Sequence, residues 1–142
     1  MRQIPPHALW LGHAGDGRDF RAILDARIQA VVQLAAEEEP LGLPRELMYC
    51  RFPLLDGAGN DEKLLHLAVT SVANLLESRI PTLVCCGGGM SRSPAIVAAA
   101  LAVVFQEKLE QCLERIAAHH PSDVVPALWN DVKALVESRF LA

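Results

Sequence analysis

The sequence predicts one α/β domain, residues 1–142, with a central, mostly parallel sheet of four to five strands and helices on both faces. Three observations lead to this prediction. The length of 142 residues suits a single hydrophobic core. Short apolar segments alternate with longer segments of helical periodicity. Glycines follow two of the apolar segments at once, as they do where a strand gives way to a turn.

The first half of the chain contains three expected strands, at residues 8–11, 28–34 and 48–54. Gly12 stops the first of them, and residues 13–18 are expected to form a loop because they include two glycines. Asp19 can cap a short helix that reaches about Ala26. Residues 56–60, Asp-Gly-Ala-Gly-Asn, have the composition of a loop.

The second half begins with residues 61–77, where apolar residues recur with helical spacing on one face. A short apolar strand is expected at 81–86, directly before a run of glycines. Ser93-Pro94 then has the form of a helix start, and residues 95–105 are apolar nearly all round, so this helix should be central and buried. Two further helices are expected near 109–118 and 126–140.

Charge and hydropathy argue against several classes of function. The net charge is −4 and no Lys/Arg cluster occurs, so no nucleic-acid partner is expected. The longest apolar run, 95–105, is too short to span a bilayer, so no membrane partner is expected either. The first residues lack the apolar stretch of a signal peptide, which favours the cytoplasm. No sequence feature specifies an oligomeric state.

Four cysteines are present, and none of them forms a CxxC pair, so neither a metal nor another cofactor is expected. In a reducing compartment a cysteine is either a small buried hydrophobic residue or a reactive thiol. Cys50, Cys85 and Cys112 fit the first description because they lie in apolar strand or helix patterns. Cys86 fits the second because it ends a strand and opens a glycine-rich loop.

The segment from Cys86 to Arg92 has the composition of an anion-binding loop. Gly87, Gly88 and Gly89 allow a sharp turn with successive N–H groups directed inward, and Met90 and Ser91 complete the loop. The start of the following helix adds positive potential, and Arg92 can hold two phosphate oxygens with its planar guanidinium. The same groups favour the thiolate of Cys86, a nucleophile placed beneath the phosphate that it would attack.

Residues 86–94 resemble the signature loop of the dual-specificity protein tyrosine phosphatases, Cys-x-x-Gly-x-Ser-Arg-Ser. Gly89, Ser91, Arg92 and Ser93 stand at the matching positions. Residues 9–12, 52–56, 119–121 and 126–129 are similar to other segments of the family, so the resemblance extends over most of the chain. It implies a protein tyrosine phosphatase-like fold.

The resemblance also implies a two-step reaction. The cysteine thiolate takes the phosphoryl group, an aspartic acid protonates the leaving oxygen, and water then hydrolyses the phosphocysteine. In this chain Ser93 would stabilise the departing thiolate. Asp56 is favoured as the acid because it follows a strand and has the family's form Pro-x-x-Asp, whereas a helix cap is a sufficient role for Asp61.

The chain departs from the family pattern at two places. The family places His directly before the nucleophile, where this chain has Cys85, a weaker hydrogen-bonding group that is expected in the core. The loop also lacks the lysines that inositol-lipid phosphatases of the superfamily commonly carry there. Outside the loop, the run 37–39 is expected to be a solvated turn, and His119 and His120 a solvated helix end.

The sequence therefore predicts a cysteine-dependent phosphatase that acts on phosphorylated proteins or peptides. Phosphotyrosine is the expected substrate, with phosphoserine and phosphothreonine as further ones. Two alternatives stay open at this point. The same chemistry could serve a non-protein phosphate such as an RNA 5′-phosphate, a sugar phosphate or a phosphoinositide, or the chain could be a phosphate-binding pseudophosphatase.

Overall fold

A computed structural model describes residues 1–140 and contains one five-stranded sheet with the order β1-β2-β5-β3-β4. The strands are β1 (Arg2–Gln3), β2 (Leu9–Gly12), β3 (Ala30–Ala35), β4 (Met48–Leu54) and β5 (Thr82–Cys85). The helices are α1 (Ala14–Arg18), α2 (Phe20–Asp25), α3 (Glu62–Glu77), α4 (Arg92–Phe105), α5 (Leu109–Ala117) and α6 (Pro126–Arg139). Strand β1 pairs antiparallel with β2, and the other strand pairs are parallel.

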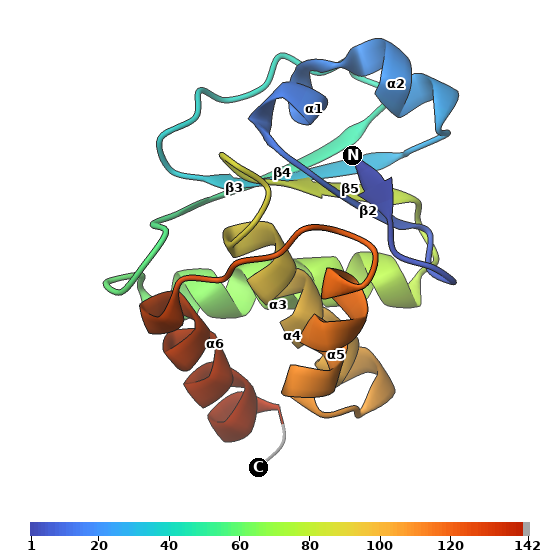
Figure 1. Ribbon diagram of the computed structural model, residues 1–142. Helices are drawn as coiled ribbons and strands as arrows, with labels where there is room; N and C mark the ends of the chain where they lie inside the picture. Colours follow the sequence, from blue (N-terminus) through green and yellow to red (C-terminus); the bar gives the residue numbers. More distant parts are fainter. Residues whose placement is uncertain (141–142) are drawn as a thin grey trace.

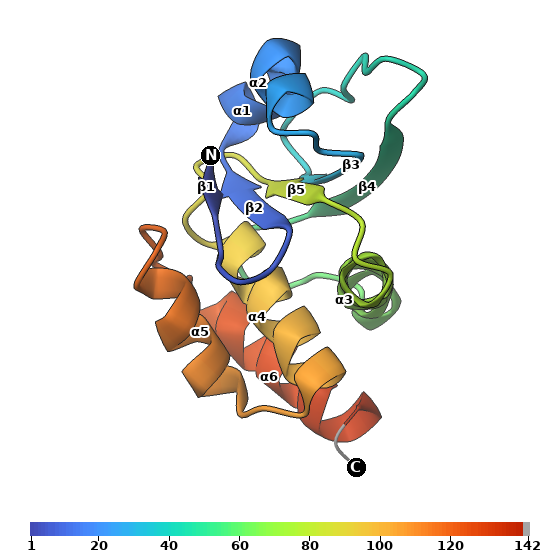
Figure 2. The ribbon, with the colours of Figure 1, turned by 90° about the vertical axis from the view of Figure 1, so that its right-hand side faces the viewer.

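Helices cover both faces of the sheet. Figures 1 and 2 show α1 and α2 on one side and α3 to α6 on the other. Each side has its own hydrophobic cluster, the smaller one around Ile23 and Leu83 and the larger one around α3, α4 and α6. The predicted fold class, with its mostly parallel sheet and helices on both faces, is confirmed.

Helix α4 is the central helix of the larger layer. All of its residues from Arg92 to Ala102 are buried, because α3, α5 and α6 surround it and the sheet covers the remaining side. A sequence that is apolar nearly all round is what such a position requires. The prediction of a central, buried helix is therefore confirmed.

Two local predictions were wrong, and one strand was missed. Residues 14–18 form helix α1 and not a loop, because His13 and Asp16 make a capping box that offsets the cost of the two glycines. The short strand β1 was not predicted at all. The N-cap of α4 is Ser91, so Ser93-Pro94 lies inside the first turn and does not start the helix.

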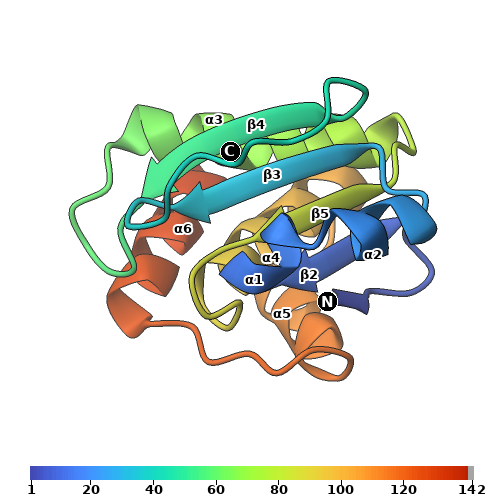
Figure 3. The same cartoon turned by 90° about the horizontal axis from the view of Figure 1, so that it is seen from above.

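The carboxyl ends of the parallel strands face the same edge of the sheet, which Figure 3 shows from above. Four loops therefore start side by side, at His13 after β2, Ala36 after β3, Leu55 after β4 and Cys86 after β5. Ligand sites of open α/β sheets lie beyond this edge. None of the helices within residues 1–140 is long and apolar enough to cross a membrane.

Candidate active site

Three backbone carbonyls of the loop 86–91 are turned outward, where donors from other segments occupy them. The Gly87 carbonyl accepts from Ala14 N at 3.0 Å, at the start of α1. The Gly89 carbonyl lies 2.5 Å from His120 Nε2, and the Met90 carbonyl accepts from Asp123 N at 2.7 Å. A loop whose carbonyls point outward must direct its N–H groups the other way.

Those N–H groups are free to bind an anion. Within residues 1–140, the N–H groups of 87–91 donate to no acceptor of the protein. Gly89 has a φ of +77°, the left-handed conformation that lets successive N–H groups converge. The loop ends on the N-terminus of α4, which adds positive potential at the same place. This arrangement is a site for a phosphate-like anion.

A segment between α5 and α6 holds the loop in this form. Residues 120–125, here called the strap, make three hydrogen bonds to three consecutive loop residues: His120 to Gly89, Asp123 to Met90, and Val125 N to Ser91 Oγ at 3.0 Å. In Figure 1 the strap crosses in front of the start of α4. His120 is buried, so the prediction that it belongs to a solvated helix end was wrong.

Arg92 is buried and held on one side by Glu37. Its Nη1 and Nη2 donate to the two carboxylate oxygens of Glu37, each at 2.6 Å, and Nη1 also donates to the Leu54 carbonyl at 2.9 Å. Leu54 ends β4, and Glu37 follows β3 after one intervening residue, Ala36. Two neighbouring strand ends therefore fix the guanidinium.

The opposite edge of the guanidinium remains available. An arginine has five N–H donors, and the contacts with Glu37 and Leu54 use three of them. Arg92 Nε is buried without a hydrogen-bond partner among the described residues. The Nε–H and the second Nη2 hydrogen are the two parallel donors that hold a phosphate in bidentate fashion.

The pair of Arg92 and Glu37 is ionised over the whole ordinary pH range. The hydrogen bonds from Arg92 lower the pKa of Glu37 from 4.5 to about 2, and those to Glu37 raise the pKa of Arg92. A Cβ atom at Gly87 would lie 2.7 Å from Glu37 Oε2 and 2.9 Å from Arg92 Nη2. Glycine at position 87 therefore leaves room for this pair. The prediction that residues 37–39 form only a solvated turn was wrong for Glu37, because its carboxylate binds Arg92.

Cys86 and Cys85 lie on opposite sides of the sheet. Cys86 packs in the larger hydrophobic cluster, beside α4, and Cys85 packs in the smaller one. Burial, followed by the neighbouring Cys86 and Asp16, raises the pKa of Cys85 to about 12. The predicted core position of Cys85 is confirmed, and it stays a neutral thiol at ordinary pH. Cys50 and Cys112 likewise pack with the larger cluster.

The two candidate acids have different surroundings. Asp61 is the N-cap of α3, and its side chain accepts from Lys63 N at 2.8 Å. Asp56 is exposed on the loop after β4, and its charge helps to raise the pKa of Arg92. The Asp56 carboxylate thus acts on Arg92 through its charge, whereas the Asp61 carboxylate is engaged at the helix end.

Ser93 lies in the first turn of α4, and its hydroxyl is fully buried without a partner among the described residues. Ser91, by contrast, accepts a hydrogen bond from the strap and makes no side-chain cap bond in its own helix. Of the two serines, Ser93 is the one whose hydroxyl has no hydrogen-bond partner among the described residues.

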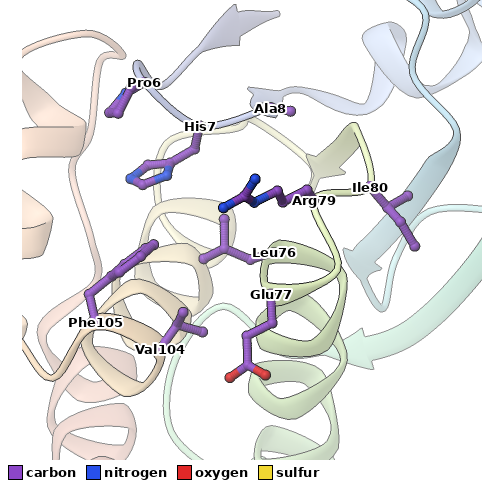
Figure 4. A pocket seen from close by; sticks show the side chains of 9 residues that line it. All are labelled: Pro6, His7, Ala8, Leu76, Glu77, Arg79, Ile80, Val104 and Phe105. Carbon is purple, nitrogen blue, oxygen red and sulfur yellow. The ribbon is translucent and has the colours of Figure 1, made fainter.

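A hollow of the described surface lies elsewhere. A cavity of about 600 Å³ opens between the ends of α3 and α4 and the segment before β2, at the edge of the sheet opposite to Cys86. Figure 4 shows His7, Leu76, Arg79 and Phe105 around it. Over residues 1–140, no group of three or more His, Cys, Asp or Glu side chains could hold a metal ion.

Residues 12–106 match a known family, "Polymorphic toxin system, DSP-PTPase phosphatase". The matched segment includes the loop 86–92, Glu37 and Asp56, and it ends before the strap. No curated protein sequence matches the chain significantly.

Solved structures show the same fold along the whole chain. Human DUSP28 superposes with a TM-score of 0.85 at 19% identity, over 97% of this chain and 96% of that one. The human tyrosine phosphatase-like serine/threonine/tyrosine-interacting protein superposes with a TM-score of 0.83 at 18% identity, over 100% of this chain and 98% of that one. PTPMT1 in complex with PI(5)P superposes with a TM-score of 0.73 at 20% identity, over 96% of this chain and 94% of that one.

Proposed function

Because the chain belongs to the DSP-PTPase phosphatase family of polymorphic toxin systems, we propose that it hydrolyses phosphomonoesters through a phosphocysteine on Cys86. The observation that carries this proposal is the loop 86–92. Three of its carbonyls are bound from outside, the N–H groups of residues 87–91 donate to no acceptor among the described residues, and Arg92 presents two unused donors on one edge.

The first step transfers the phosphoryl group. The Cys86 thiolate forms a bond to phosphorus while the bond from phosphorus to the leaving oxygen breaks. Asp56 gives its proton to that oxygen, and an alcohol or phenol leaves. The free N–H groups of the loop and the unused edge of Arg92 stabilise the charge on the equatorial oxygens.

The second step restores the enzyme. Water attacks the phosphorus and gives a proton to the Asp56 carboxylate, the bond between sulfur and phosphorus breaks, and inorganic phosphate leaves. Ser93 donates a hydrogen bond to the departing thiolate, which is consistent with its buried hydroxyl that has no partner among the described residues.

An aromatic phosphate ester is the substrate class that the rim of the site supports best. Met90 in the loop and Leu55 beside Asp56 are about half exposed, and both are apolar. Such a rim suits the ring of phosphotyrosine. We therefore propose phosphotyrosine in proteins or peptides as the main substrate, with phosphoserine and phosphothreonine as further ones.

A phosphoinositide is the second candidate substrate, since PTPMT1 in complex with PI(5)P shares the fold. The loop of this chain, however, has no lysine, and Glu37 neutralises Arg92. Several phosphates on one ligand need more positive charge than this. The charge distribution therefore favours a substrate with a single phosphate.

Turnover assays test the proposal. Purified protein is expected to hydrolyse p-nitrophenyl phosphate and a phosphotyrosine peptide with inhibition by vanadate, and Cys86→Ser is expected to be inactive. Phosphotyrosine peptide should be turned over faster than PI(5)P, RNA 5′-phosphate or a sugar phosphate. Equal rates for wild type and Cys86→Ser would overturn the enzyme proposal and leave a phosphate-binding protein.

A matched pair of variants tests the acid. Asp56→Asn is expected to lower kcat for phosphotyrosine peptide by about 10²- to 10⁴-fold, the usual contribution of general acid catalysis. Asp61→Asn keeps a good helix cap and is expected to stay within about twofold. The opposite ranking of these two variants would assign the acid to Asp61.

A further inference from the structure

The loop that carries Asp56 is closed by one side chain. Asn60 Oδ1 accepts from Leu55 N at 2.7 Å, and Asn60 Nδ2 donates to the Leu55 carbonyl at 2.9 Å and the Gly57 carbonyl at 3.3 Å. Both amide hydrogens of Asn60 are therefore used within the loop. The segment 57–59, Gly-Ala-Gly, would otherwise be among the least constrained parts of the chain.

The three hydrogen bonds lie on both sides of Asp56. Leu55, which precedes Asp56, is held through its N–H and its carbonyl, and Gly57, which follows, is held through its carbonyl. Gly59 supports the same turn with a φ of +97°. The Asp56 side chain itself makes no hydrogen bond within the described part of the chain, so its direction depends on this backbone.

Asn60 is itself anchored to a rigid element. The next residue, Asp61, is the N-cap of α3, and Leu65 N donates to the Asp61 carbonyl at 3.1 Å. Helix α3 packs against α4, whose first turn contains Arg92 and Ser93. The position of Asn60 is thus fixed relative to the loop 86–92. Through its hydrogen bonds, Asn60 also fixes the backbone around Asp56 relative to that loop.

We propose that Asn60 is a positioning residue for the general acid: it holds the loop so that the Asp56 carboxyl faces the leaving oxygen. The inference rests on the proposed phosphatase function and adds a residue to it. Without Asn60 the loop samples other conformations, and the proton is delivered only in the fraction that keeps the correct one.

The dependence on the leaving group distinguishes this role from a structural one. Protonation by Asp56 matters for a poor leaving group such as the phenol of phosphotyrosine, and little for the good leaving group of 2,4-dinitrophenyl phosphate. Asn60→Ala is expected to lower kcat/KM for phosphotyrosine about tenfold and to change it less than twofold for 2,4-dinitrophenyl phosphate. Asn60→Asp keeps the acceptor for Leu55 N, so its kcat/KM for phosphotyrosine should lie between those of wild type and Asn60→Ala.

Two comparisons complete the experiment. Asn130→Ala replaces an exposed asparagine on α6 and is expected to match wild type with both substrates. In an Asp56→Asn background, Asn60→Ala should lower kcat/KM for phosphotyrosine less than twofold, because the effects of residues that act through one another are not additive. Amide hydrogen exchange at Leu55 should become faster in Asn60→Ala, while Tm stays near that of wild type.

Each contrary result has a separate meaning. An equal loss of rate with both substrates, or full additivity with Asp56→Asn, would overturn the positioning role while wild-type turnover still supports the proposed function. A wild type with no Cys86-dependent turnover would overturn both, and faster exchange at Leu55 would then show only that Asn60 orders the loop.

Discussion

Replacing Glu37 by glutamine tests whether the ion pair with Arg92 supports catalysis. The change is nearly isosteric and removes one negative charge. The amide oxygen of the new side chain can still accept from Arg92, but its NH₂ group faces the second guanidinium nitrogen and repels it. One of the two 2.6 Å hydrogen bonds is therefore lost.

The size of the effect follows from the exposure of the two partners. A hydrogen bond between charged groups is worth roughly 1.5–3 kcal/mol where water is excluded. The Arg92 side chain is only 5% exposed, but Glu37 is 58% exposed, so solvent screening reduces the loss to about 1–2 kcal/mol. That corresponds to a fall of about 5- to 30-fold in kcat/KM.

The assay compares kcat/KM for phosphotyrosine peptide in Glu37→Gln and Glu39→Gln. Glu39 is exposed two residues further along, so its replacement removes the same charge from the same segment without touching Arg92. Equal changes in the two variants would refute the reasoning, since the effect would then be one of net charge in this segment alone. A faster Glu37→Gln would also refute it, because Glu37 would then compete with the phosphate.

The pH dependence of the pair has a defined sign. The pKa of Glu37 falls from 4.5 to about 2 on folding, so the contribution of the pair to stability is fully present above pH 4.5 and is lost as the pH falls toward 2. Any fall in the wild-type rate toward acid that occurs above pH 4.5 is therefore caused by the titration of groups other than Glu37. Glu37→Gln should leave the pH dependence of that fall unchanged.

Three further predictions concern the loop and its neighbours. Gly89→Ala should lower Tm and vanadate affinity, because the φ of Gly89 is +77° and a Cβ atom there would lie 2.9 Å from Gly12 backbone atoms. The control is Gly88→Ala, which should match wild type in thermal melts because a Cβ atom at Gly88 would have no atom within 4 Å apart from those of its chain neighbours. His120→Ala should weaken vanadate binding about 5- to 30-fold by loss of the bond to Gly89, and His120→Gln should restore part of it in a titration. Iodoacetamide at pH 7 should alkylate Cys86 and leave Cys85 intact by mass spectrometry, since the pKa of Cys85 is about 12.

The regular elements of the fold could be predicted because each has a strong local signal. Strand β4 was predicted with its observed bounds, and α3 and α6 within one residue at either end. Asp19 caps α2 as expected, with its side chain accepting from Ala22 N at 3.1 Å. The short helix α1 was missed because glycine content predicts a loop there, and the stabilising capping box starts from a histidine, an uncommon N-cap.

The site could be predicted only where its residues are close in sequence. Cys86 and Arg92 are six positions apart and share one loop, so their pattern is visible in the sequence. Glu37 lies 55 positions from Arg92, and a run of glutamates looks like solvated surface. His120 was misjudged for the same reason, since its partner Gly89 is 31 positions away. Contacts over such separations depend on the topology of the sheet.

The strap also decides when during synthesis the phosphate loop takes its shape. Its side-chain hydrogen bonds join residues 31 and 34 positions apart, and all of its donors follow α5. A nascent chain that ends at Phe105 already contains Cys86, Arg92 and Asp56 but none of these donors. Because a chain emerges N-terminus first and distant contacts form late, we expect tight anion binding only after residues 120–125 have left the ribosome.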